Sequence, residues 1–190
     1  TTTTTTTIII IIIDKNIYSR MVTKVIVVHG GELARDVAEQ IEAVQPSGGA
    51  FEVKLRCASE RPKTLLDYKS DNADDKVVLC FVLQTIENAA PTEEGGSVVR
   101  FFKRKTHPSD LLVSANLKYA VLGLGDSNLL LDRQTTAAKD CNQAAEQLDA
   151  RLASLGGERQ CELGMADERT GLTEVEPWIK NVFWKSFADA

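Results

Sequence analysis

Short apolar runs alternate with longer amphipathic runs along most of the chain. Residues 24–30, 76–83 and 118–125 are mostly apolar and rich in β-branched side chains, a pattern typical of strands buried on both faces of a sheet. Residues 51–56 alternate apolar and polar side chains, which predicts an edge strand. A last strand is predicted over 159–164.

Amphipathic segments separate and follow these strands. Helices are predicted over 32–44, 96–105, 137–157 and 176–187. The third segment closes with a glycine pair, which commonly ends a helix. Five strands separated by helices predict an α/β fold, with a parallel sheet covered on both faces in three α/β/α layers.

Ligands of such sheets bind beside the carboxyl ends of the strands, where the winding direction reverses. The loops after Val28, Leu83 and Leu122 follow the three apolar strands. These loops are therefore the candidate site.

The chain of 190 residues is long enough for one domain with a full core. Residues 1–21 begin with a homopolymeric threonine and isoleucine tract, and we interpret them as a low-complexity tail outside a domain that covers 22–190. The run Ile8–Ile13 is far shorter than a membrane span, so no membrane contact is expected. Met21 is a candidate start of the natural protein.

Charge and cysteine usage exclude some classes of function. The formal net charge is -5 with both signs interspersed, so no nucleic-acid partner is expected. The cysteines Cys57, Cys80, Cys141 and Cys161 lie far apart without a Cys-x-x-Cys pair, which favours reduced thiols and a cytoplasmic location. His29 has no cysteine or histidine close to it in sequence, so no metal site is expected.

The C-terminal half of the chain carries a series of motifs in a fixed order. They are Gly123–Ser127, Leu148-Asp149, Arg151-Leu152, Leu155-Gly156, Gly164, Ala166-Asp167, Gly171-Leu172 and Glu176–Trp178. In these positions the chain resembles the FMN domain of the diflavin reductases, the family of cytochrome P450 reductase and methionine synthase reductase. The first half agrees with that family only in its order of strand, loop and helix.

The resemblance implies a flavodoxin-like sheet of five parallel strands in the order 2-1-3-4-5. It also implies FMN as the cofactor and electron transfer to a redox or other protein partner. The site residues that it implies are His29, Gly30, Gly31, Gly123, Gly125, Asp126, Ser127, Asn128 and Asp167. Asp167 keeps a second interpretation, as the N-cap of a helix. Because no FAD or NADPH module lies in these residues, we expect no catalysis by the domain alone.

The three loops depart from the family pattern. The first reads HGGELAR, which places Glu32 where the family has glycine, and a carboxylate there would compete with the phosphate for helix N-terminal amides. The second has no aromatic residue and carries Glu87, Glu93 and Glu94. In the third, Leu129 stands where the family has an aromatic ring, and an insertion follows it.

These departures leave two hypotheses of different classes. In the first, the domain has lost tight FMN binding and acts as a scaffold or partner-binding module. In the second, it is a working FMN electron-transfer domain that holds the cofactor through the backbone amides of Gly30 and Gly31, because amides can replace hydroxyl donors around an anion. If the first is correct, the set Glu32→Gly, Gly31→Thr and Leu129→Tyr should recover some affinity for FMN.

Two other interpretations have less support. Gly123 and Gly125 begin a dinucleotide-binding fingerprint, but the third glycine position is Asn128. Ser127 has no histidine placed to activate it, so the sequence does not favour hydrolase chemistry.

Overall fold

The structure is a computed structural model that describes residues 22–47, 51–68, 77–87, 89–130 and 141–188. The predicted low-complexity tail, residues 1–21, lies outside the described residues. So does most of the predicted insertion after Leu129.

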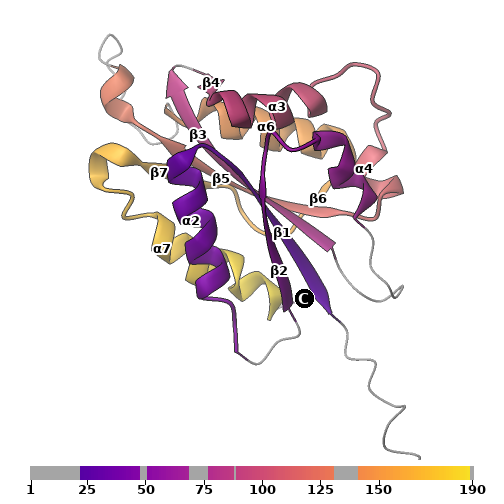
Figure 1. Cartoon of the computed structure of the whole chain (residues 1–190), viewed down its shortest axis with the longest axis horizontal. Coiled ribbons are helices and arrows are strands. Elements are labelled where there is room, and N and C mark those ends of the chain that lie inside the picture. The colour runs from indigo at the N-terminus through magenta and orange to yellow at the C-terminus, as the bar shows by residue number, and fades with distance from the viewer. Residues whose placement is uncertain (1–21, 48–50, 69–76, 88, 131–140, 189–190) are drawn as a thin grey trace, which may run out of the picture.

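A parallel sheet forms the middle layer of the domain (Figure 1). Its order is β2-β1-β3-β5, and two short strands, β6 and β7, both pair in parallel with the far side of β5. This confirms the predicted order 2-1-3-4-5. The strands are β1 (Thr23–Gly30), β2 (Phe51–Cys57), β3 (Val77–Glu87), β5 (Lys118–Gly125), β6 (Glu158–Arg159) and β7 (Gly164–Asp167).

Helices cover both faces of the sheet, which confirms the three-layer α/β/α fold (Figure 1). One face carries α2 (Glu32–Ala43) and α7 (Val175–Trp178), which continues as a π-helical segment (Ile179–Phe183) and a 3-10 turn (Lys185–Phe187). The other face carries α3 (Glu93–Phe102), α6 (Gln143–Ser154) and the short α4 (Leu111–Ser114). Further 3-10 turns are Pro62–Asp67, Ser127–Leu130 and Glu168–Thr170. Within the described residues, every helix is too short or too polar to cross a bilayer.

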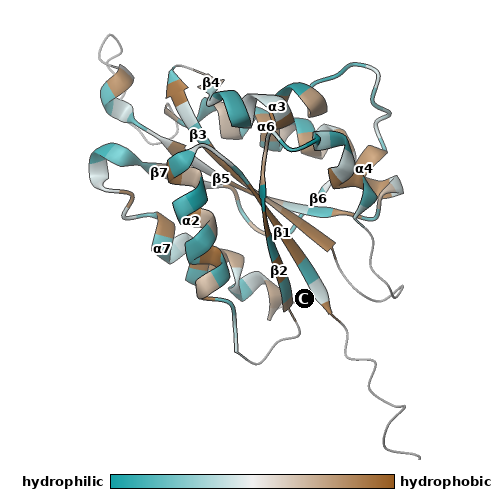
Figure 2. Ribbon diagram, in the orientation of Figure 1, coloured by the Kyte–Doolittle hydropathy of each residue, from teal (hydrophilic) through white to brown (hydrophobic). Residues whose placement is uncertain are grey.

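The central strand β3 contributes to both cores. Leu79, Phe81 and Leu83 pack with α3 and α6, whereas Cys80 and Val82 pack with α2 and α7. All five side chains are fully buried. Figure 2 shows the same pattern as an apolar band through the centre of the sheet, with polar residues on the outer sides of the helices.

The predicted last strand over 159–164 is wrong in its bounds, because the chain there leaves the ladder and returns to it. Only Glu158–Arg159 and Gly164–Asp167 are strand. Between them, the Glu162 carbonyl accepts a hydrogen bond of 3.0 Å from the Trp178 indole N–H. The excursion therefore gives a buried indole its hydrogen-bond partner.

The segment after β3 also differs from the prediction. It was expected to form a long loop before a helix at 96–105, but β3 continues to Glu87 and pairs antiparallel with β4 (Ala90–Pro91). α3 then begins at Glu93, because the Thr92 hydroxyl accepts a hydrogen bond of 3.1 Å from the N–H of Gly95. Thr92 is thus an N-cap, and Glu93 and Glu94 lie in the first helical turn.

Gly30 is required where β1 meets the first turn of α3. A Cβ atom at this position would lie 2.5 Å from the Cα atom of Gly95, a backbone atom that cannot rotate away. We therefore expect Gly30→Ala to lower the free energy of unfolding by about 2 kcal/mol through overpacking, as measured by urea denaturation. Gly96→Ala is a control for the substitution itself, since only the flexible end of the Arg100 side chain lies within 4 Å of a Cβ there; an equal loss in both variants would contradict the packing argument.

Candidate functional site

The first loop lies at the boundary between β1 and β3, where a doubly wound sheet binds its ligand. β1 ends at Gly30, beside Leu83 of β3, and α2 begins at Glu32. The intervening residue Gly31 has a φ of 120°, and its N–H donates a hydrogen bond of 3.0 Å to the Glu94 carboxylate. An amide that a bound anion would use is therefore already paired with a carboxylate of the same chain.

Glu32, which the sequence suggested as the competing carboxylate, has a different position. Its side chain is 88% exposed and lies 4.0 Å from the guanidinium of Arg35. The carboxylate on the loop amide belongs to Glu94 instead, from the first turn of α3. Sequence reasoning noticed Glu94 only as an added charge in the second loop, since the fold alone brings it to Gly31.

The third loop is held together by Asp167, which lies at the end of β7 and is 2% exposed. Its carboxylate accepts hydrogen bonds of 3.0 Å from the N–H groups of Ser127 and Arg169. The Arg169 guanidinium in turn donates to the Ser127 hydroxyl at 2.6 Å. Asp167 also caps the 3-10 turn that follows it, so the N-cap interpretation of this residue describes its geometry.

The pKa of Asp167 reflects these contacts. Burial acts to raise the pKa of this carboxyl, but the hydrogen bonds from Ser127 and from the Arg169 N–H, together with the Arg169 charge, outweigh burial and hold the pKa below 3.8. The group is therefore a carboxylate at neutral pH.

The Asn128 amide of this loop is also paired. The N–H of Asn128 donates to the Asp126 carboxylate at 2.8 Å, which forms an Asx turn. With Ser127 paired to Asp167, the loop presents two amides that are already bonded within the chain.

Gly123 and Gly125 lie against the start of α6. A Cβ on Gly123 would be 2.5 Å from the Asn142 side-chain oxygen, and one on Gly125 would be 2.7 Å from the Cys141 sulfur. Asn142 is fully buried, and its amide donates to the Ala166 carbonyl at 2.9 Å. The two glycines thus let β5 approach the residues that precede α6 closely.

A side-chain bridge crosses the carboxyl edge of the sheet from β3 to the turn after β7. The Gln84 amide donates to the Glu168 carboxylate at 3.1 Å. Gln84 also lies against Gly31, since a Cβ there would be 2.7 Å from its side-chain oxygen. Neither Gln84 nor Glu168 was among the predicted site residues, because no motif marks them.

These contacts make the substitution Gly31→Thr unsuitable for restoring a phosphate loop. A threonine would be strained at a φ of 120°, and its Cβ would contact both Gln84 and Thr92 at under 3 Å. A restoring set therefore has to leave Gly31 in place.

His29 has companions that the sequence did not show. Ligand atoms of His29, Cys57 and Glu94 all lie within 4.8 Å of one another. Burial, the largest cause, lowers the pKa of His29 below 6.5, although the Glu94 charge acts in the opposite direction. No cysteine lies close to His29 in sequence, but the pairing of β1 with β2 places Cys57 opposite His29.

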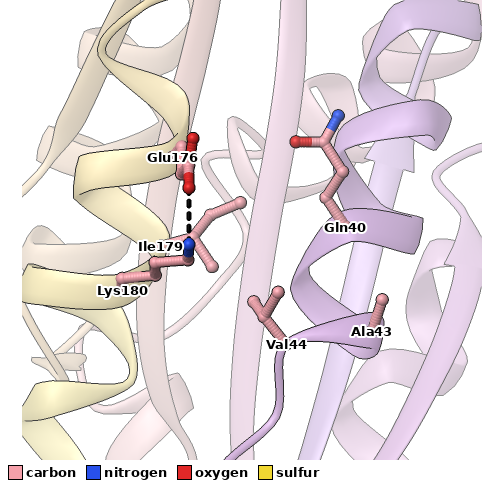
Figure 3. A pocket seen from close by; sticks show the side chains of 6 residues that line it. All are labelled: Gln40, Ala43, Val44, Glu176, Ile179 and Lys180. Atoms are coloured by element: carbon pink, nitrogen blue, oxygen red, sulfur yellow. Dashed lines mark hydrogen bonds and ion pairs between the residues drawn. The ribbon is translucent and has the colours of Figure 1, made fainter.

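Two pockets lie along α2. One of about 250 Å³ lies between the last turns of α2 and the C-terminal helical segment, and Figure 3 shows Gln40, Ala43 and Val44 opposite Ile179 and the paired Lys180 and Glu176. Another, of about 470 Å³, is nearer the carboxyl edge and lies between α2 and residues 171–176. The first pocket includes no residue of the three loops, whereas the second includes Leu33 from the HGGELAR segment of the first loop.

A doubly wound parallel sheet of this order, with its loops gathered at the switch point between β1 and β3, defines a flavodoxin-like α/β domain. A sequence model of the family described as Flavodoxin matches residues 32–178. The chain belongs to the flavodoxin family.

Its sequence relatives are diflavin reductases. Methionine synthase reductase of Bos taurus is 36% identical over 152 residues, which are 80% of this chain and 19% of that protein. NADPH-dependent diflavin oxidoreductase 1 of Danio rerio is 28% identical over 166 residues, which are 85% of this chain and 24% of that protein. The chain thus spans about a fifth to a quarter of the length of these relatives, and it is a flavodoxin-like domain of the diflavin reductase family, as the resemblance indicated.

Solved structures confirm the fold. A mutant flavodoxin from Pseudomonas aeruginosa superposes with a TM-score of 0.58 at 17% identity, covering 87% of this chain and 99% of that one. Fusobacterium nucleatum flavodoxin bound to flavin mononucleotide gives 0.54 at 11% identity, covering 88% and 95%.

The described loops do not fit FMN as they are arranged. The phosphate needs free donors, but the Gly31 amide is bonded to the Glu94 carboxylate. The flavin ring gains from aromatic stacking, but Leu129 stands at the expected aromatic position and is 56% exposed. The Ser127 amide, a candidate donor to the ring, is bonded to Asp167.

Proposed function

We propose that this domain has lost tight FMN binding and serves as a scaffold or partner-binding module of a diflavin reductase-like protein. The observation that carries the proposal is the hydrogen bond between the Gly31 amide and the Glu94 carboxylate. A phosphate at the start of α2 would have to displace that carboxylate and then remain close to its charge, which is unfavourable at any distance within the loop.

The third loop supports the same proposal. Its amides have carboxylate acceptors at Asp126 and Asp167, and hydrogen bonds to charged groups are among the stronger ones in proteins. A flavin would have to offer better acceptors than two carboxylates. Its carbonyl oxygens and ring nitrogens are neutral, so the exchange would lose stability.

The colour of the purified protein tests the proposal directly. Protein from flavin-supplemented expression is expected to be colourless, and titration into FMN should leave the flavin fluorescence unquenched at micromolar concentrations. Protein that is yellow and releases one equivalent of FMN on denaturation would overturn the proposal.

The second candidate is a working FMN electron-transfer domain of an NADPH-dependent reductase-like protein. It is favoured by the relatives, whose names are those of reductases, and by Gly30 and Gly31, which stay at the start of α2. It predicts a yellow protein with FMN in equimolar amount, so the same experiment separates the two candidates.

Under either candidate, we propose that the domain works beside a protein partner and in the cytoplasm. The family association supports a partner, since the relatives are several times longer than this chain. All four cysteines are reduced thiols, which suits a reducing compartment.

A further inference from the structure

Three side chains with different ligand atoms meet at the carboxyl edge of the sheet. His29 and Cys57 are ladder partners at the ends of β1 and β2, so their side chains leave the sheet on the same face. Glu94 reaches them from the first turn of α3. One imidazole nitrogen, one sulfur and one carboxylate oxygen then lie within 4.8 Å of one another.

The imidazole of His29 has an unused ring atom. Its Nδ1 atom is buried and makes no hydrogen bond within the described residues. A buried polar atom without a partner costs about 1–3 kcal/mol, and such atoms call for an explanation such as an ion.

The charges around His29 favour a cation. The negative charges of three carboxylates, Glu94, Glu60 and Glu39, attract a cation at the imidazole, whereas the positive charge of Arg35 repels it. The Cys57 sulfur lies 3.0 Å from the Ser59 hydroxyl, which can donate to a thiolate and stabilise it. Cys57 is half-buried and Glu94 is exposed, so a metal ion in solution can reach the site.

We propose that His29, Cys57 and Glu94 form a zinc-binding site with a fourth position open to water. Nitrogen, sulfur and carboxylate oxygen are the three ligand types that Zn²⁺ uses, whereas Mg²⁺ and Ca²⁺ require oxygen ligands. A tetrahedral zinc site holds its ligand atoms roughly 3.3–3.8 Å apart, so binding requires a movement of about 1 Å. The exposed Glu94 side chain can make this movement by using the carboxylate oxygen that is not bonded to the Gly31 amide. Binding forms the Zn–S bond and releases the thiol proton to solvent.

This inference does not rest on the proposed loss of FMN binding. A zinc site at residues 29, 57 and 94 is compatible with a colourless or a yellow protein. Metal binding is detected through the metal–sulfur bond, and this measurement does not depend on whether the protein contains FMN. Glu94 takes part in both arguments, so the test is carried by Cys57, which has no part in the argument about FMN.

The experiment titrates the untagged full chain, reduced and freed of metal, with Co²⁺ and then with Zn²⁺. Co²⁺ is expected to bind one equivalent and to produce thiolate-to-cobalt charge-transfer absorption in the near ultraviolet, with visible bands of a four-coordinate ion. Zn²⁺ should abolish both by displacement, whereas excess Mg²⁺ should not. Cys57→Ser should remove the charge-transfer band and weaken binding on the order of 100-fold or more, since even outer-shell partners of a metal contribute 10–100-fold.

The matched control is Cys161→Ser. Cys161 is half-buried like Cys57, but it belongs to the core on the α2 and α7 face, so its variant should keep the full band. Glu94→Gln preserves an acceptor for the Gly31 amide and should weaken Co²⁺ binding while the circular dichroism spectrum stays unchanged. Absence of a stoichiometric Co²⁺ complex, or a charge-transfer band that survives Cys57→Ser, would overturn the proposal.

Discussion

Replacing Asp167 with alanine is expected to lower the free energy of unfolding by about 3 kcal/mol. The carboxylate is buried and accepts the N–H groups of Ser127 and Arg169 at 3.0 Å each. Hydrogen bonds to a charged group contribute roughly 1.5–3 kcal/mol each, and the variant leaves both donors without an acceptor. Urea denaturation at pH 7, followed by circular dichroism, measures the loss.

The same residue gives a pH dependence whose sign follows from its pKa. The pKa of Asp167 is held below 3.8 in the folded protein, so its contribution to stability is complete above that value and is lost as pH falls through the lowered pKa. Asp167→Asn has the same shape but cannot titrate. The wild type should therefore lose stability more steeply than Asp167→Asn below pH 3.8, and parallel curves for the two proteins would contradict this account.

Replacing Glu94 with alanine is expected to raise the affinity for FMN on the order of 100-fold. The substitution frees the Gly31 amide and removes a charge that repels the phosphate. Two like charges about 6 Å apart at an effective dielectric of about 20 repel by roughly 2.8 kcal/mol, which corresponds to about that change in affinity. Equilibrium dialysis with EDTA present measures the change without interference from metal ions.

Controls separate the phosphate from the flavin ring. Riboflavin lacks the phosphate, so its affinity should stay unchanged in Glu94→Ala. Glu93→Ala removes a carboxylate from the same helical turn, whereas the hydrogen bond to the Gly31 amide comes from Glu94; this variant should gain far less. An equal gain for riboflavin and FMN, or for the two alanine variants, would show that the carboxylate at position 94 does not block a phosphate site.

The sheet was predictable because buried parallel strands have a strong sequence signature. The observed strand over Lys118–Gly125 has the predicted bounds, and Thr23–Gly30 begins one residue earlier than expected. The strand predicted over 159–164 was wrong in its bounds. The chain leaves the sheet there, and the Glu162 carbonyl accepts a hydrogen bond from the Trp178 indole; such a contact with a distant helix has no pattern in the sequence. Likewise, Thr92 as an N-cap is a local signal that sequence reasoning missed.

The site was harder to predict than the fold, because its contacts join residues far apart in the chain. The hydrogen bond from Gly31 to Glu94 spans 63 positions, and only the packing of α3 beside β1 creates it. The pairing of His29 with Cys57 could have been predicted from the sequence, because aligning the two adjacent predicted strands places these residues opposite each other. Gln84 and Glu168 had no distinguishing motif at all.

The shared central strand couples the two cores of the domain. Phe81 and Leu83 face one core, and Cys80 and Val82 face the other. A shift of β3 by one residue in its pairing register would exchange the side chains that face the two cores. The helices on both faces would then lose the side chains against which they pack. A single strand thus fixes the alignment of both layers, so the loops at its carboxyl end are held in place from both sides of the sheet.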